Sequence, residues 1–294
     1  MRRLLALVVL IGAATACSSG GFPGADPASS ISVVTTTPVL TDFVQVIGGD
    51  HVAVDGVLKP NVDPHDFEPS PADIDALANA DVIVRNGAGL ESWFDDTIAA
   101  AEPKGEVVDA STGVALRGDD PHIWHDPRNA EIMAGNVEAA LAKADPNHTA
   151  DYERNLAAYR QQLEALDASN AAQLATLTDK QLVTNHDAFG YYVARYGLTL
   201  VGSIIPSFDT SAELSAAQID DIVHKIEATG TKAVFSETSV PAKTAEAIGA
   251  EAGVKVVAGD DALYGDSLGP PGTDGDTYLK MEAHNTRVIV DNLR

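Results

Sequence analysis

The sequence has very little cysteine: Cys17 is the only one among 294 residues. A single cysteine excludes an intrachain disulfide, and it also excludes a metal site built from several thiolates. We therefore expect neither a disulfide framework nor thiol redox chemistry in this chain.

Positive charge is scarce as well. The chain has 19 lysines and arginines against 43 aspartates and glutamates, so its formal net charge is −24. A surface of this charge repels a polyanion, and we expect no nucleic-acid partner. Hydrophobic residues make up 45% of the chain, which is enough to build a core and is not typical of a disordered acidic protein. The length is compatible with one large domain or with two lobes.

The apolar run at the N-terminus is too short to cross a bilayer, which takes about 20 residues. It extends from Leu4 to Ala16, follows Arg2 and Arg3, and ends in small residues. This pattern is typical of a secretory signal peptide. We expect residues 1–16 to be removed on export.

Cys17 comes directly after these small residues, an arrangement that resembles a bacterial lipoprotein processing site. In that pattern the cysteine becomes the new N-terminus and is diacylated, here with palmitate as the expected acyl chain. Residues 17–30 are rich in Ser, Gly and Pro and are predicted to form a flexible tether. The predicted location is the outer face of the bacterial cytoplasmic membrane, with Cys17 as lipid anchor. The alternative is a cleaved, soluble exported protein with an unmodified thiol.

Beyond the tether, short β-branched runs alternate with longer helical patterns, which is typical of βα units and a mostly parallel sheet. Helix starts are marked by Ser70-Pro71 and Asp126-Pro127, where a capping side chain precedes a proline at the first helical position. The predicted strands are 31–36, 52–58, 81–85, 106–108, 181–184, 198–205, 232–235 and 254–257.

A stretch free of Gly and Pro follows Pro146 and extends to Thr178, with apolar residues spaced by four and three. It predicts one amphipathic helix of roughly 40 Å. We therefore expect an α/β protein with an N-terminal lobe (31–145), a connecting helix (146–178) and a C-terminal lobe (179–294).

Three of the eight histidines stand at predicted loop-to-helix junctions, where an α/β sheet presents its ligand crevice. They are His65, His122 and His186. Zinc takes four N, O or S donors, usually in a tetrahedron, so three imidazoles leave one position to fill. Asp266 is the best carboxylate in the late loop, although a turn or helix cap is its alternative role.

Several segments of the chain resemble the zinc- and manganese-binding solute-binding proteins of bacterial ABC importers, the ZnuA- and TroA-like family. The similarity extends from about Ile31 to Arg294, and the segments occur in the same order. The matching segments are 64–71, 86–93, 120–124, 185–191, 235–237, 265–268 and 275–278, with Pro-His-Asp-Phe-Glu-Pro-Ser-Pro, Asp-Pro-His-Ile-Trp and Asn-His-Asp-Ala-Phe-Gly-Tyr among them.

The resemblance implies that His65, His122, His186 and Asp266 are the metal ligands, two from each lobe. The fold it implies is two Rossmann-like α/β lobes with mostly parallel sheets, joined by one long rigid helix, with the site in the cleft between them. The function it implies is capture of a divalent cation outside the membrane and delivery to an ABC permease and its ATPase. We expect a monomer.

Two further residues stay open between roles. His125 stands three residues after His122 and is a candidate fifth ligand, although the family usually has an apolar residue at that position. Glu237 matches a family carboxylate near the site, where it either orients an imidazole or caps a helix start. The remaining histidines are expected to be solvated: His51, His148, His224 and His284.

Three neutral imidazoles and one carboxylate suit Zn²⁺, whereas Mn²⁺ prefers oxygen-rich surroundings. Zinc is therefore the expected cargo, and a manganese receptor of the same type is the alternative. Two other classes are an exported zinc hydrolase and an adhesin. The hydrolase is disfavoured because four ligands leave no position for a catalytic water, and because the sequence lacks His-Glu-x-x-His, His-x-His-x-Asp and Gly-x-Ser-x-Gly. We expect no enzymatic activity.

Overall fold

The computed structural model describes residues 30–212 and 214–294. The predicted signal peptide and Cys17 lie outside the described residues, as does nearly all of the predicted tether. Within the described part of the chain, no helix is both long enough and apolar enough to cross a membrane.

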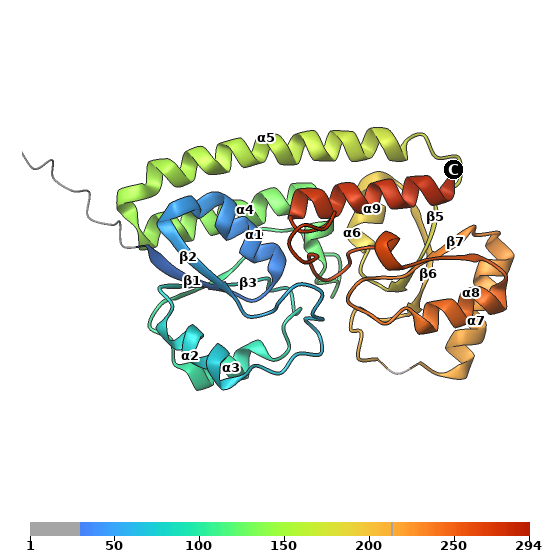
Figure 1. Ribbon diagram of the computed structural model, residues 1–294, viewed down its shortest axis with the longest axis horizontal. Coiled ribbons are helices and arrows are strands. Elements are labelled where there is room, and N and C mark those ends of the chain that lie inside the picture. Colours follow the sequence, from blue (N-terminus) through green and yellow to red (C-terminus); the bar gives the residue numbers. More distant parts are fainter. Residues whose placement is uncertain (1–29, 213) are drawn as a thin grey trace, which may run out of the picture.

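Over the residues that the structure describes, the fold contains two four-stranded sheets, and every strand pair in them is parallel. The first sheet has the order β2–β1–β3–β4, with β1 Ile31–Thr35, β2 Val52–Gly56, β3 Val82–Arg85 and β4 Glu106–Asp109. The second has the order β6–β5–β7–β8, with β5 Gln181–His186, β6 Thr199–Ile205, β7 Ala233–Phe235 and β8 Lys255–Val257. The predicted α/β class with two parallel sheets is confirmed, and the two lobes lie side by side (Figure 1).

Helices cover both faces of each sheet. The N-terminal lobe contains α1 Pro38–Gly48, α2 Pro71–Asn79, α3 Phe94–Ala101 and α4 Pro127–Ala144. The C-terminal lobe contains α6 Gly190–Tyr196, α7 Ala216–Thr229 and α8 Lys243–Ala252. The described part of the chain also has four short 3₁₀ helices: η1 Gly49–His51, η2 Ile123–His125, η3 Pro146–His148 and η4 Gly259–Asp261.

Local sequence explains where the helices begin. The Ser70 side chain accepts the backbone N–H of Asp73, and the Asp73 carboxylate accepts that of Ser70, which closes a capping box at the start of α2. Asp126 accepts the N–H of Arg128 at the start of α4, directly before Pro127. Both helix starts lie where the capping patterns predicted them.

Successive residues of a strand contribute to two different hydrophobic cores, one on each face of the sheet. Val33 and Val84 contribute to one core with α1, α4 and α5, whereas Val34 and Ile83 contribute to the opposite core with α2 and α3. Full burial of one such side chain stabilises the folded state by about 1.5–3 kcal/mol. The C-terminal sheet is covered in the same way by α6 and α9 on one face and by α7 and α8 on the other.

The long helix α5 extends from Thr149 to Leu174, and the residues before it form η3. The C-terminal helix α9, Tyr278–Leu293, packs alongside α5 and also reaches into both lobes (Figure 1). Its residues Tyr278 and Met281 belong to the core of the N-terminal lobe, whereas Ile289 and Leu293 belong to that of the C-terminal lobe. The helix α9 therefore connects the two lobes in addition to α5, the connecting helix that the sequence predicted.

Candidate metal centre

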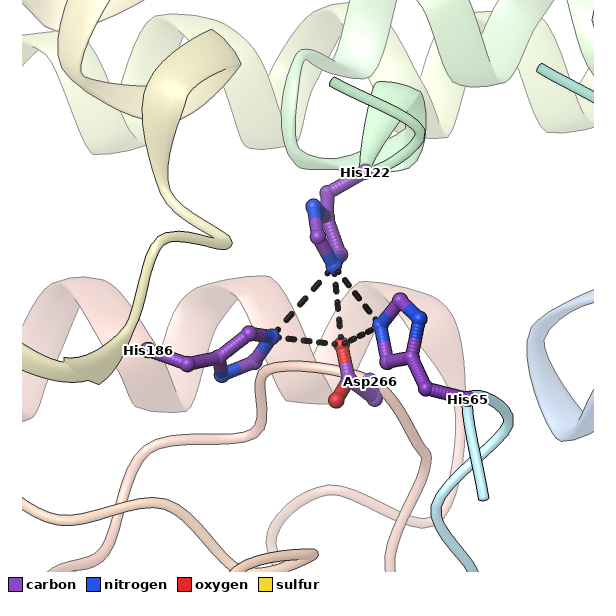
Figure 2. A group of neighbouring side chains, drawn as sticks. All are labelled: His65, His122, His186 and Asp266. Atoms are coloured by element: carbon purple, nitrogen blue, oxygen red, sulfur yellow. Dashed lines mark hydrogen bonds and ion pairs between the residues drawn. The ribbon is translucent and has the colours of Figure 1, made fainter. Parts of the chain in front are cut away.

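Four side chains converge between the lobes (Figure 2). His65 lies in the loop between β2 and α2, and His122 lies immediately before η2. His186 is the last residue of β5, and Asp266 lies in the loop between β8 and α9. One donor atom from each lies within 4.8 Å of those of all the others. The structure thus brings together all four residues that the sequence predicted to be ligands.

The distances between the donor atoms resemble the edges of a tetrahedron. Nε2 of His122 is 3.3 Å from Nε2 of His65 and 3.3 Å from Nε2 of His186. Oδ1 of Asp266 is 3.2 Å from Nε2 of both His122 and His186, and 3.9 Å from Nε2 of His65. A tetrahedral zinc with bonds of about 2.0–2.1 Å has edges of about 3.3–3.4 Å. Four of the measured edges are therefore close to this geometry, and the group is wider on the His65 side.

All four side chains are buried. Those of His122, His186 and Asp266 are fully buried, and that of His65 is 5% exposed. A cavity of about 280 Å³ is lined by His65, together with Asp119, Phe208 and Asp209 from loops of both lobes. Of the four residues, His65 alone lines this cavity.

Carboxylates orient two of the imidazoles. Nδ1 of His122 is 2.9 Å from Oδ1 of Asp120, and Nδ1 of His186 is 2.8 Å from Oε2 of Glu237. A carboxylate beside Nδ1 favours a proton on that nitrogen, so Nε2 is the atom that can bind an ion once its own proton has left. Glu237, which was predicted either to orient an imidazole or to cap a helix, contacts the ring of His186. Asp120 was missed as a functional residue.

The pattern that could have revealed Asp120 is Asp-Pro-His, which occurs twice. Asp120 accepts the backbone N–H of His122 at 3.0 Å, and Asp63 accepts that of His65 at 2.9 Å. In each case the aspartate turns the chain so that a histidine two residues later faces the centre. Asp63 also accepts the hydroxyl of Thr210 at 2.5 Å, a contact that links the His65 loop to the C-terminal lobe.

The charges at the centre are strongly coupled. Burial alone would lower the pKa of His186, but the carboxylates of Asp266 and Glu237 raise this pKa well above 6.5. Burial alone would raise the pKa of Asp266, but the imidazoles of His186, His122 and His65 hold it well below 3.8.

Asp266 is buried and ionised, and no donor is aligned for a hydrogen bond to either of its oxygens, although the Nε2 atoms of His122 and His186 lie 3.2 Å from Oδ1. Leaving a buried charge without hydrogen bonds is costly. A divalent cation between the four side chains would compensate that charge, so the residues present fit a metal ion.

His125, the candidate fifth ligand, lies outside this group. Its Nε2 donates to the carbonyl of Gly265 at 2.9 Å, and its Nδ1 is 2.7 Å from Oε1 of Glu282 on α9. Burial raises the pKa of Glu282, although His125 opposes this shift. Both ring nitrogens of His125 therefore have protein partners.

The prediction that the other histidines are solvated holds for His224, which is exposed, and is wrong for His284. His284 is 3% exposed, and its Nε2 donates to the carbonyl of Ala262 at 3.0 Å. Its spacing from the buried residues Met281 and Val288 on α9 could have indicated the buried face. His51 and His148 are half-buried, and their rings stack at 3.8 Å.

Among residues 30–212 and 214–294, no second group of three or more His, Cys, Asp or Glu side chains is arranged to hold a metal ion. The two carboxylates beside the group, Asp120 and Glu237, each lie against Nδ1 of one of its imidazoles.

Comparison with known proteins places the chain among metal receptors. The family model described as "Zinc-uptake complex component A periplasmic" matches residues 33–292. The manganese-binding lipoprotein MntA of Bacillus subtilis (strain 168) is 30% identical over 312 residues, which cover 100% of both chains. The iron ABC transporter substrate-binding lipoprotein MtsA of Streptococcus pyogenes serotype M1 is 29% identical, over 95% of this chain and 93% of its own.

Among solved structures, the periplasmic zinc-binding protein TroA from Treponema pallidum superposes with a TM-score of 0.83 at 31% identity. The match covers 90% of this chain and 99% of that one. The lobes and connecting helices described above are therefore shared with a protein described as binding zinc.

Proposed function

Because the chain belongs to the family of zinc-uptake component A, the metal-binding substrate-binding proteins of ABC importers, we propose that its cargo is Zn²⁺ and that His65, His122, His186 and Asp266 bind it. Members of this family are solute-binding receptors and not enzymes.

The observation that carries the proposal is the donor set itself. Three imidazole nitrogens and one carboxylate oxygen face one another at 3.2–3.9 Å along the five edges described above. The relatives are named for manganese, iron and zinc, so similarity to them does not identify the ion. The choice of ion therefore rests on the chemistry of the donor set. Nitrogen-rich, four-donor sites suit zinc, whereas manganese prefers more oxygen.

Manganese is the second candidate, and two observations favour it. Both oxygens of Asp266 lack hydrogen-bond donors, and the edge to His65 is the widest of those measured, at 3.9 Å. A carboxylate that binds through both oxygens would raise the coordination number above four. Such a site would accommodate an ion that takes more than four donors.

The cavity that His65 lines supports reversible capture over permanent structural binding. We propose that the monomeric receptor delivers its ion to a permease driven by an ATPase. We also propose that Cys17 anchors it to the outer face of the cytoplasmic membrane. A Cys17→Ala variant should then appear in the culture medium or periplasm with unchanged metal affinity.

Chelator competition tests the cargo and the ligands together. Wild-type protein should bind one Zn²⁺ more tightly than Mn²⁺. His122→Ala should weaken zinc binding by more than the ~10–100-fold loss that is typical when a residue that only hydrogen-bonds to a metal ligand is replaced. The matched control is His224→Ala, which removes an exposed imidazole on α7. Equal zinc affinity of the two variants would reject the ligand set, whereas tighter binding of Mn²⁺ by the wild type would reject only the choice of zinc. Element analysis of protein purified from its native membrane without added metal then identifies the physiological cargo.

A further inference from the structure

The carbonyl oxygen of Gly265 receives two hydrogen bonds from the opposite lobe. Nε1 of Trp124 donates at 3.2 Å, and Nε2 of His125 donates at 2.9 Å. Both donors lie in η2, directly after the proposed ligand His122. Gly265 itself directly precedes the proposed ligand Asp266, so these bonds join the chain segments that carry two proposed ligands.

The His125 ring is held on three sides. A carbonyl oxygen only accepts, so Nε2 of His125 must carry a hydrogen. Nδ1 lies 2.7 Å from Oε1 of Glu282, which is fully buried on α9, and the ring of Phe189 stacks on the imidazole at 4.6 Å. Because Nε2 is protonated and Nδ1 is engaged, this imidazole contributes no lone pair to an ion.

Gly265 is confined on its other side as well. A Cβ atom at this position would lie 2.1 Å from Oε2 of Glu237, the oxygen that contacts the ring of His186. The Gly265 backbone therefore lies between Glu237 and His125. The segments that carry His122, His186 and Asp266 therefore meet at Gly265.

We propose that His125, oriented by Glu282, is a positioning residue that fixes the Gly265 carbonyl and thereby the Asp266 carboxylate in its metal-binding place. This inference rests on the proposed function, because it takes Asp266 to be a ligand. A loop already ordered in its bound conformation loses less entropy when the ion binds. The hydrogen bond from His125 to Gly265 therefore raises metal affinity although His125 does not contact the ion. Its loss should mainly accelerate release of the ion.

The substitutions that test this proposal differ in which hydrogen bonds of His125 they keep. His125→Leu removes both hydrogen bonds and leaves Glu282 buried without its partner. His125→Leu combined with Glu282→Met removes the whole pair, and apolar replacement of a buried pair is often neutral for stability. His125→Gln keeps an N–H donor that can reach the Gly265 carbonyl. His224→Ala on the exposed face of α7 is the control.

Three measurements on each apo or loaded variant separate positioning from stability: the melting temperature of the apo protein, the Zn²⁺ affinity by chelator competition, and the visible absorption spectrum with Co²⁺ as a probe. We expect His125→Leu to bind zinc ~10–100-fold more weakly, as for other outer partners of a metal site. The double variant should regain apo stability but not affinity, and its Co²⁺ bands should differ from those of the wild type. His125→Gln should recover most of the affinity.

The proposal is overturned if the double variant binds zinc as tightly as the wild type with an unchanged Co²⁺ spectrum, because the pair would then serve stability alone. Wild-type affinity of His125→Leu would overturn it as well. Asp266→Ala distinguishes this failure from failure of the proposed function. If Asp266→Ala binds zinc like the wild type, the ligand set is wrong. If Asp266→Ala loses zinc while the His125 variants keep it, only the positioning role of His125 is wrong.

Discussion

A single carboxylate holds both the main chain and the ring of His186. Oε1 of Glu237 accepts the backbone N–H of His186 at 2.9 Å, and Oε2 lies 2.8 Å from Nδ1 of the same residue. Both side chains are fully buried. Rotation of the imidazole away from the proposed metal position would therefore break a contact in a region that water does not reach.

Glu237→Gln keeps the shape of this side chain and removes its charge. We expect zinc affinity to fall by ~10–100-fold, because the neutral amide no longer favours the proton on Nδ1 that leaves Nε2 free. Chelator competition measures the change. Glu227→Gln, an exposed substitution on α7, is the control. Unchanged affinity of Glu237→Gln would show that the carboxylate does not act through the ring.

Gly265→Ala should weaken zinc binding and lower stability together. The new Cβ would meet Oε2 of Glu237 at 2.1 Å, so the loop or the carboxylate must move. Overpacking of this kind typically costs about 1–3 kcal/mol in the free energy of unfolding. The control is Gly135→Ala on α4, where the nearest atom is the end of the flexible Arg160 side chain at 3.3 Å. Urea unfolding and zinc competition should show both losses in Gly265→Ala alone.

Zinc affinity should rise with pH throughout the neutral range. Imidazoles must lose a proton to bind, and the pKa of His186 in the apo protein is raised well above 6.5 by Asp266 and Glu237, despite the opposing effect of burial. Calorimetry in buffers of different ionisation enthalpy should detect proton release on zinc binding above pH 6.5. Affinity that stays constant between about pH 5 and 7.5 would contradict histidine ligation.

The charges of His186 and Asp266 also make the free energy of unfolding of the metal-free protein depend on pH. The stabilisation that His186 gains from its raised pKa is fully present below 6.5 and is lost as pH rises through the higher folded value. The stabilisation from Asp266 is present above 3.8 and is lost as pH falls through its lowered folded value. Saturating zinc replaces these proton-dependent contributions, so the alkaline loss attributed to His186 should be absent from the zinc-loaded protein.

A separate effect of pH on stability is expected from Asp42, which lies on α1. Burial raises its pKa to about 6, against the hydrogen bond from the Tyr278 N–H, and the charge of Asp276 adds to the rise. Ionisation of such a group destabilises the folded state as pH increases from 3.8 through 6, by about 3 kcal/mol.

Asp42→Asn should therefore be about as stable as the wild type near pH 4 and clearly more stable at pH 7.5. Urea unfolding at both pH values measures the difference. The exposed substitution Asp50→Asn is the control. An equal effect of Asp42→Asn at the two pH values would contradict the raised pKa.

Fold class and the four converging side chains could be predicted because their signals are local. β-branched runs mark the strands, and a capping side chain before proline marks the starts of α2 and α4. His122 directly precedes η2, His186 ends β5, and His65 lies in the loop before α2. The resemblance to a known family then selected Asp266 from many acidic residues.

The remaining features depend on contacts between distant parts of the chain. The bonds from His125 join it to residues 140 and 157 positions later, and no sequence spacing reveals such a partner. The sharing of α9 between two cores was missed for a similar reason: its apolar residues show one buried face, but not that the two halves of that face contact different lobes. His284 was misjudged because a buried histidine needs only one well-placed carbonyl, here that of Ala262.

The most direct test of the central claim is an anomalous difference map, measured at the zinc absorption edge, from crystals of the zinc-loaded protein. We predict one strong peak about 2.0–2.2 Å from Nε2 of His65, His122 and His186 and from an oxygen of Asp266. A peak bound by other side chains, or no peak between these four, would contradict the account.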